Sequence, residues 1–361
     1  MIYLILKIVF AIFILWKVSS SFDLAANYLT RDIGEGIKGP TINAIASSLP
    51  ELFISFLFLF YYGDIKGFSA GYATIIGSSA FNIAVIPVVS FLVVFFRKKT
   101  QHFEVDRNIL RQDGLFLLGA VLLFLGGLYY GINKYFAVVL IVYYILYIRS
   151  LYISRKDNET GAEKNNIVRI EPSTGILLDI LNIRLFRVFT AGKVNSITSI
   201  FVIIASIAII AYSCHLLITS TEEISRYIGV NLFFVSFIIA SIASSLPDTF
   251  LSVKDAINGK FNDSFSNAYG SNMFDICIGL GLPLLIYTYL HGPIDTTFAI
   301  KRIGSLGDSI LNGNVLIWSI LLLLILTTVT SLIYYCKQLR FRYAVLILLL
   351  YLLFMFGLII F

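Results

Sequence analysis

The chain has 361 residues, of which 58% are hydrophobic and 13% are charged. A water-soluble domain of this length could not bury so much apolar surface, so part of that surface must face lipid. The formal net charge of +6 comes from basic clusters between apolar runs. This distribution argues against a nucleic-acid partner and favours a role in membrane orientation.

Long apolar runs predict about ten membrane-spanning helices, because a helix needs about twenty mostly apolar residues to cross a hydrocarbon layer roughly 30 Å thick. In chain order they cover residues Ile2 to Val18, Ile37 to Tyr62, Phe68 to Phe96, Gly114 to Gly131, Tyr135 to Ile153, Ile197 to Ser220, Val230 to Val253, Phe265 to Tyr289, Val315 to Cys336 and Tyr343 to Phe361. We therefore expect an all-α integral membrane protein whose main partner is the lipid bilayer. The oligomeric state is left open, with a monomer expected to be sufficient for function.

The first run contains Lys7 and lacks a short apolar core followed by a small-residue cleavage site, so we interpret it as a retained helix. Basic residues cluster after the third, fifth and ninth runs, within residues 97–111, 155–193 and 337–342. The positive-inside rule assigns these clusters to the cytoplasm and both termini to the opposite face. We expect a multi-pass protein of the plasma or cytoplasmic membrane.

Residues 154–196 form the one substantial polar linker. This linker, expected to be cytoplasmic, divides the chain into an N-terminal five-helix half, residues 1–153, and a C-terminal five-helix half, residues 197–361. Within it, Ile176 to Phe189 mixes apolar residues with arginines. That composition suits an interfacial helix or a plain lead-in to the sixth span, and both interpretations stay open.

Each half carries a copy of the same two motifs. Ala46-Ser-Ser-Leu-Pro-Glu-Leu-Phe-Ile-Ser55 matches Ala243-Ser-Ser-Leu-Pro-Asp-Thr-Phe-Leu-Ser252, and Gly77-Ser-Ser-Ala-Phe-Asn-Ile83 matches Gly270-Ser-Asn-Met-Phe-Asp-Ile276. The copies of the first motif lie five crossings apart, so they enter the membrane from opposite sides. Two inverted-topology repeats of five helices are typical of secondary transporters, whose substrate site lies where the copies meet.

Proline inside each first motif predicts an interrupted helix. Pro50 and Pro247 cannot donate to the carbonyls of Ala46 and Ala243, so we expect both helices to break there. Carbonyl oxygens freed at membrane depth must be buried or line a polar cavity, where they are good ligands for hard cations.

The motifs also bring acids into the membrane without basic partners. Glu51, Asp248 and Asp275 have no lysine or arginine in their motif segments, and an acid at the bilayer centre costs at least about 2.5 kcal/mol. A mobile cation is the expected counter-charge. Together with an amide and hydroxyls the acids form an oxygen-only set that suits sodium and calcium more than transition metals: Glu51, Asp248, Asp275, Asn82, Ser47, Ser48, Ser78, Ser244, Ser245 and Ser271.

Other polar residues are left out of this site. Asp64, Asp255 and Asp263 lie near the ends of predicted spans and are expected to meet water. Cys214, Cys277 and Cys336 are scattered, which favours neither a disulfide framework nor a zinc site. The motif glycines and serines also suit plain helix packing.

These motifs resemble those of the calcium/cation antiporter superfamily, which carries Ser/Thr-Ser-x-Pro-Glu/Asp followed by Gly-Ser-x-x-Phe-Asn/Asp in both halves. The segment Gly270 to Pro283 looks most like sodium/calcium exchangers, particularly the potassium-dependent branch. Ala46 and Ala243 stand where the family often has Gly, and Ser47 and Ser244 where Thr is common.

The resemblance implies transport of Ca2+ and Na+, with K+ in the potassium-dependent branch, without a cofactor or an enzymatic reaction. It implies that Glu51 and Asp248 hold Ca2+ with the Ser47 and Ser244 carbonyls. Positions for Na+ or K+ would use Ser48, Ser78, Ser245, Ser271, Asn82 and Asp275. It also implies alternating access, in which the first and sixth helices slide across a core and extend past the bilayer through residues 19–30 and 220–226.

Three alternatives remain. A calcium/proton antiporter of the same superfamily would load protons in place of sodium, although the Gly-Asn-x-x-Glu pattern of that branch is absent. A passive cation channel also uses oxygen-lined sites. An intramembrane aspartyl protease would use two buried acids, and Leu306-Gly-Asp308 faintly resembles its motif, but Ser305 replaces the required glycine.

Overall fold

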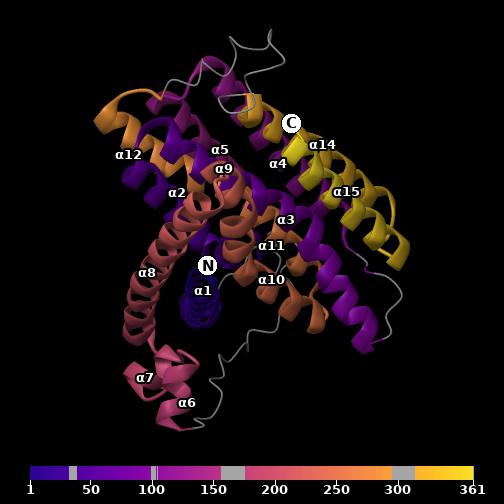
Figure 1. Cartoon of the computed structure of the whole chain (residues 1–361). Coiled ribbons are helices and arrows are strands. Elements are labelled where there is room, and N and C mark those ends of the chain that lie inside the picture. The colour runs from indigo at the N-terminus through magenta and orange to yellow at the C-terminus, as the bar shows by residue number, and fades with distance from the viewer. Residues whose placement is uncertain (32–38, 99–102, 104, 156–174, 295–313, 361) are drawn as a thin grey trace.

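The computed structural model describes residues 1–31, 39–98, 103, 105–155, 175–294 and 314–360. Within these residues, ten helical segments are long and apolar enough to cross a membrane, which confirms the predicted fold class (Figure 1). The spans are α1 (Ile2–Leu29), η1 with α2 (Gly39–Asn43, Ala44–Tyr62), α3 (Asp64–Lys98), α4 (Arg107–Tyr130), α5 (Lys134–Arg155), α8 (Ser196–Ile228), α9 with η3 and α10 (Leu232–Val235, Ser236–Ala240, Ser241–Ile257), α11 with η4 and α12 (Phe261–Phe274, Asp275–Leu280, Gly281–His291), α14 (Asn314–Cys336) and α15 (Phe341–Ile360).

Both motif prolines lie inside continuous α-helices, which corrects the expectation that the helices break at these positions. Pro50 is inside α2 and Pro247 is inside α10. Each proline removes one hydrogen bond, but the rest of the ladder holds the helix together. The irregular turns lie upstream, in the π-helical segments η1 and η3 that lead directly into α2 and α10. A π-helical turn widens a helix locally without ending it.

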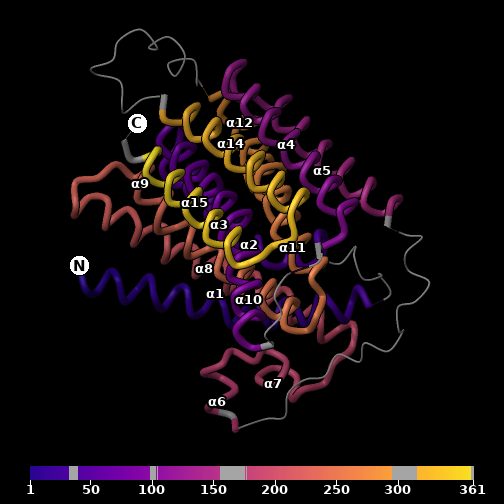
Figure 2. Tube along the Cα trace, turned by 90° about the vertical axis from the view of Figure 1, so that its right-hand side faces the viewer, coloured from indigo at the N-terminus to yellow at the C-terminus, as the bar shows by residue number. Residues whose placement is uncertain are grey.

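Part of the polar linker is helical. Residues 176–189 form two short helices, α6 (Ile176–Leu181) and α7 (Leu185–Thr190), in place of one interfacial helix. Both lie together at one end of the bundle, next to the start of α8 (Figures 1 and 2). Leu185 and Phe186 are buried against Ala25 of α1 and Val202 of α8, so α7 is anchored to both long helices. The linker residues 156–174 and Asp308 lie outside the described residues.

The first helix of each half runs antiparallel to its counterpart. Lys7, near the start of α1, pairs with Glu223, near the end of α8, with 3.7 Å between Nζ and Oε1. Opposite directions for corresponding helices are what an inverted repeat requires. Both helices continue through the polar stretches at residues 19–29 and 220–226, as expected for helices that extend past the bilayer.

Two glycines let the repeats cross at close range. A Cβ atom on Gly270 of α11 would lie 2.5 Å from the Pro40 Cα atom in η1, and a Cβ atom on Gly77 of α3 would overlap the Phe237 carbonyl oxygen in η3. Pro40 and Phe237 each precede the first motif of their repeat by the same six positions. The two contacts are therefore equivalent, and in each one a small residue brings one repeat against the other.

Adding a methyl group at this crossing should destabilise the protein. We expect Gly270→Ala to lower the stability by about 1–3 kcal/mol, because the backbone of η1 cannot move away as a flexible side chain could. Thermal unfolding of the purified protein in detergent measures the change. Gly126→Ala in α4 is the matched control, because a Cβ atom there meets nothing within 4 Å. Equal melting temperatures for the two variants would contradict the crossing as a constraint.

Candidate cation-binding site

The ten candidate residues come from four spans that pack on one another. α2 and α10 carry the first motifs, α3 carries Ser78 and Asn82, and α11 with η4 carries Ser271 and Asp275. α3 packs against α2 and α10, and α11 packs against all three. All ten side chains are buried, and Glu51, Asp248 and Asp275 have an exposed fraction of 0%. The packing thus gathers the duplicated motifs inside the protein.

Ser78 is the hub that joins the acids. Its hydroxyl lies 3.1 Å from Glu51 Oε1 and 3.2 Å from Asp275 Oδ2, so it faces one acid from each repeat. The Ser245 hydroxyl approaches it from the second repeat at 2.9 Å. One hydroxyl carries one proton and cannot donate fully to two carboxylates. Another positive species is therefore needed to share the space between Glu51 and Asp275.

Asp248 has its own set of donors. Ser271 Oγ donates to Asp248 Oδ1 at 2.8 Å. This contact in the second half is equivalent to the contact between Ser78 and Glu51 in the first half. Asn82 Nδ2 lies 3.3 Å from Asp248 Oδ2 and 3.4 Å from Ser78 Oγ. The amide therefore links the two repeats across the centre of the site.

Ser47 and Ser244 use their hydroxyls locally. Ser47 Oγ donates to the Asn43 carbonyl at 2.7 Å, and Ser244 Oγ donates to the Ser241 carbonyl at 3.1 Å. Such bonds back to the preceding turn are common for serine within membrane helices. The same hydroxyls also interact with the acid of the opposite repeat, Ser47 with Asp248 and Ser244 with Glu51, so both residues border the site.

Several buried oxygens of the site accept no hydrogen bond from the described residues. They are Ser48 Oγ, Glu51 Oε2, Asn82 Oδ1 and Asp275 Oδ1. A buried polar atom without a partner is costly, and a hard cation satisfies such oxygens directly. The described part of the chain also contains no ion pair to Glu51, Asp248 or Asp275. The donor set therefore fits a mobile cation.

The site differs from a compact metal centre. Among the described residues, no group of three or more His, Cys, Asp and Glu side chains converges in the way that holds a metal ion. An ion bound here would need hydroxyl, amide and backbone oxygens beside the carboxylates. Mixed oxygen shells of this kind are normal for calcium and sodium, which take flexible coordination.

Sequence reasoning missed one intramembrane acid. Asp113 of α4 is fully buried and accepts hydrogen bonds from Ser266 of α11 at 2.8 Å and Tyr147 of α5 at 3.3 Å. It precedes the predicted start of its span, Gly114, and follows Arg111, so no apolar pattern marked it as buried. Its hydroxyl donors tie α11, which carries Ser271, to the outer helices.

The acids left out of the site fall into different environments. Asp64 is exposed and accepts a hydrogen bond from Tyr287 at 2.9 Å, in line with its expected contact with water. Asp255 differs, because its Oδ2 atom is buried and accepts no hydrogen bond from the described residues. The residue as a whole is partly exposed, so one carboxylate oxygen is buried while the side chain still reaches the surface.

A family model described as "Sodium/calcium exchanger protein" matches residues 3–153 and 198–360. Human sodium/potassium/calcium exchanger 2 is 35% identical over 86 residues, which are 24% of this chain and 13% of that protein. Human sodium/potassium/calcium exchanger 1 is 30% identical over 93 residues, 26% of this chain and 8% of that protein. The matched part thus spans far less than two thirds of these relatives.

Two solved structures share the fold over nearly the whole chain. The H+/Ca2+ exchanger CAX gives a TM-score of 0.70 at 17% identity and covers 99% of this chain and 82% of its own. The sodium-calcium exchanger NCX_Mj gives a TM-score of 0.61 at 19% identity, with coverages of 98% and 97%. The fold and the site define a multi-pass membrane protein with duplicated, acid-bearing repeats. The chain belongs to the sodium/calcium exchanger protein family.

Neutralising a buried acid should stabilise the ion-free protein. We expect Glu51→Gln to melt at a higher temperature than the wild type without added cations, because it removes a charge whose desolvation costs several kcal/mol. The same variant should gain less from CaCl2, because ligands stabilise only through sites that they bind. Differential scanning calorimetry in detergent measures both effects. Glu223→Gln is the control, because that side chain is 51% exposed. Wild-type behaviour of Glu51→Gln in both conditions would contradict this assignment.

Proposed function

We propose that this protein is a secondary active antiporter that exchanges Na+ for Ca2+ across a membrane by alternating access. One observation carries the proposal: three fully buried carboxylates, supplied by both repeats, have no ion pair among the described residues, and two of them, Glu51 and Asp275, each keep an oxygen without a hydrogen-bond partner there. A mobile cation completes such a site, and an antiporter must bind one ion before releasing another. The protein would need no cofactor and carry out no chemical reaction.

The proposed ligands divide between two kinds of ion. Glu51 and Asp248 would hold Ca2+ with the carbonyl oxygens of Ser47 and Ser244, because they are the equivalent acids of the two first motifs, on helices α2 and α10 that pack together. The remaining oxygens would serve Na+ or K+ positions: Ser48, Ser78, Ser245, Ser271, Asn82 and Asp275. Ser78 supports shared use, because its hydroxyl approaches acids of both groups.

The charge balance of the site would couple the movement of Na+ to that of Ca2+. Three carboxylates with one Ca2+ leave a formal charge of −1, whereas three Na+, or one Ca2+ with one K+, leave zero. A neutral loaded site crosses a low-dielectric barrier at less cost than an anionic one. Bound ions would therefore permit the switch between inward and outward states, and the empty site would resist it.

A Ca2+/H+ antiporter is the second candidate. The Ser78 hydroxyl faces two carboxyl groups at similar distances, and a proton on either group would satisfy that geometry as a sodium ion would. The preference for Na+ rests on the motif composition described above. A passive channel would move Ca2+ only downhill, so uphill Ca2+ movement driven by Na+ would exclude it.

The arrangement in the membrane is part of the same proposal. Residues 1–153 and 197–361 would be the two five-helix halves, joined by a cytoplasmic linker at residues 154–196. Both termini would lie on the non-cytoplasmic side of a plasma or cytoplasmic membrane, because basic residues follow the odd-numbered spans.

Calcium uptake into proteoliposomes tests the driving ion. We expect an imposed Na+ gradient to drive uphill uptake, whereas a pH gradient alone should not. Repeating the assay with and without K+ tests co-transport. Uptake driven by protons alone would select the second candidate, and downhill flux alone would select a channel.

Variants of the acids test the ligand assignment in that assay. Glu51→Gln and Asp248→Asn should abolish exchange while the protein still folds, because each removes a charge that holds Ca2+. Asp275→Asn should retain Ca2+ transport with an altered dependence on Na+ and K+. Folding is checked by monodisperse elution from a sizing column. Wild-type flux from the first two variants would remove both acids from the site.

A further inference from the structure

The two ends of the α1–α8 pair meet the rest of the protein differently. Lys7 marks one end, where it pairs with Glu223. Asp23 lies sixteen residues further along α1, which is about 24 Å along a helix axis. These two residues therefore identify opposite ends of the pair.

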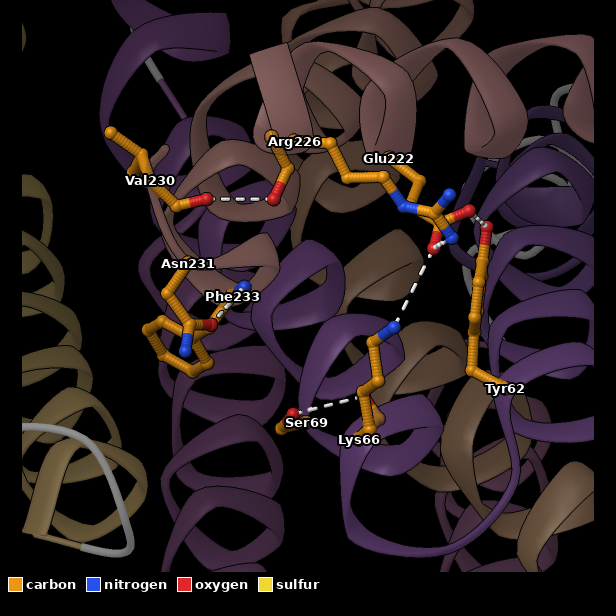
Figure 3. Close-up of polar contacts among 9 residues, drawn as sticks. Tyr62, Lys66, Ser69, Glu222, Arg226, Val230, Asn231 and Phe233 are labelled. Atoms are coloured by element: carbon orange, nitrogen blue, oxygen red, sulfur yellow. Dashed lines mark hydrogen bonds and ion pairs between the residues drawn. The ribbon is translucent and has the colours of Figure 1, made fainter. Parts of the chain in front are cut away.

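The end near Glu223 is bonded to the core. Glu222 accepts a hydrogen bond from Tyr62 at the end of α2 and lies 3.5 Å from Lys66 at the start of α3 (Figure 3). Arg226 of α8 donates to the same carboxylate at 2.6 Å. Tyr62 and Lys66 therefore hold α8 against α2 and α3 at this end through Glu222, a residue that is 8% exposed, and Arg226 supports the same carboxylate from within α8.

The end near Asp23 contains a cavity of about 230 Å3 between α1, α2 and α10. Its walls include Ser19 and Asp23 of α1 and Lys254 of α10, while Ser47 and Pro247 come from the first motifs of the two repeats. Ser47 is one of the proposed Ca2+ ligands. The cavity therefore reaches from one end of the bundle to one residue of the candidate cation-binding site.

A weak ion pair lies at this cavity. Lys254 Nζ is 3.6 Å from Asp23 Oδ2, and the Lys254 side chain is 60% exposed whereas that of Asp23 is 9% exposed. Asn27 also donates to Asp23 Oδ1, at 2.6 Å. An ion pair with one largely exposed partner contributes little stability. A divalent cation, with twice the charge of the ammonium group, can therefore displace Lys254 from Asp23.

We propose that this cavity is an access vestibule for cations, in which Asp23 binds the arriving ion and Lys254 is a tethered competitor for the same carboxylate. The ligand class is a hydrated alkali or alkaline-earth cation. The proposal rests on the proposed function for the onward step to Glu51 and Asp248. α6 and α7 pack at this end of α1, so the vestibule would open to the side that holds the basic linker.

The protein carries its own reporter of binding in the vestibule. Trp16 lines the cavity and stacks on Phe250 with 4.4 Å between ring centroids. The sequence has two tryptophans, so Trp318→Phe leaves Trp16 as the sole tryptophan, whose emission can be excited selectively over that of the tyrosines. Titration of this purified protein with CaCl2 should give a saturable change in emission. This readout does not depend on transport.

Two variants on this background test the roles of the pair. Asp23→Asn should raise the half-saturating Ca2+ concentration by roughly tenfold, because it removes the charge that attracts the ion. Lys254→Gln should lower the half-saturating Ca2+ concentration by roughly two- to fivefold, because an exposed ion pair contributes an energy that corresponds to a change in affinity of this size. Lys254 is exposed enough for the substitution to leave folding intact. Lys193→Gln, an exposed charge near the same end, is the control and should not shift the titration.

The outcomes separate this proposal from the proposed function. Shifted titrations in a protein without gradient-driven Ca2+ transport would uphold the vestibule and contradict the antiporter. Active exchange in a protein whose two variants titrate like the wild type would contradict the vestibule and leave the antiporter standing. A shift of the same size in Lys193→Gln would reduce the effect to general surface charge and overturn the role of Lys254.

Discussion

The structure depends on one electrostatic constraint: three carboxylates have no exposed surface, and no ion pair to them exists within the described residues. Taking such charges out of water costs several kcal/mol each unless a counter-charge is present. Hydroxyls of Ser78 and Ser271 and the amide of Asn82 meet part of this need. One oxygen each of Glu51 and Asp275 has no hydrogen-bond partner in the part of the chain that the structure describes.

The crossing of the two repeats places polar side chains of one repeat beside the buried acids of the other. Ser78 from the first repeat faces Asp275 from the second, and Asn82 from the first faces Asp248 from the second. Gly77 and Gly270 make the close approach possible at equivalent positions. Because each half supplies part of the proposed ligand set, a cation bound between the halves would stabilise one relative arrangement over another. Differential binding of that kind is what allows an ion to bias a conformational equilibrium.

Much of this arrangement follows from sequence, because apolar runs of membrane length and duplicated motifs are both visible in one chain. The aligned copies identified ten oxygen-bearing residues, and the fold buries each of them. The sequence predicts helix breaks at Pro50 and Pro247, but this prediction is wrong. The irregular turns are the π-helical segments η1 and η3 upstream, and the α-helices continue through both prolines. Asp113 and the Asp23–Lys254 pair could not be found, because their roles depend on which helix faces meet, and a single sequence carries no signal for that.

Calcium efflux from preloaded proteoliposomes tests most directly whether passing ions are the counter-charges of the buried acids. The outside medium would contain only N-methyl-D-glucamine as cation, at the same pH as the inside, because this ion is too large for a site between packed helices. If the empty, anionic site resists the switch, net efflux stalls in this medium and resumes when Na+ or Ca2+ is added outside. Sustained net efflux without any transportable external cation would contradict the account, because the unloaded acids would then cross without their counter-charges.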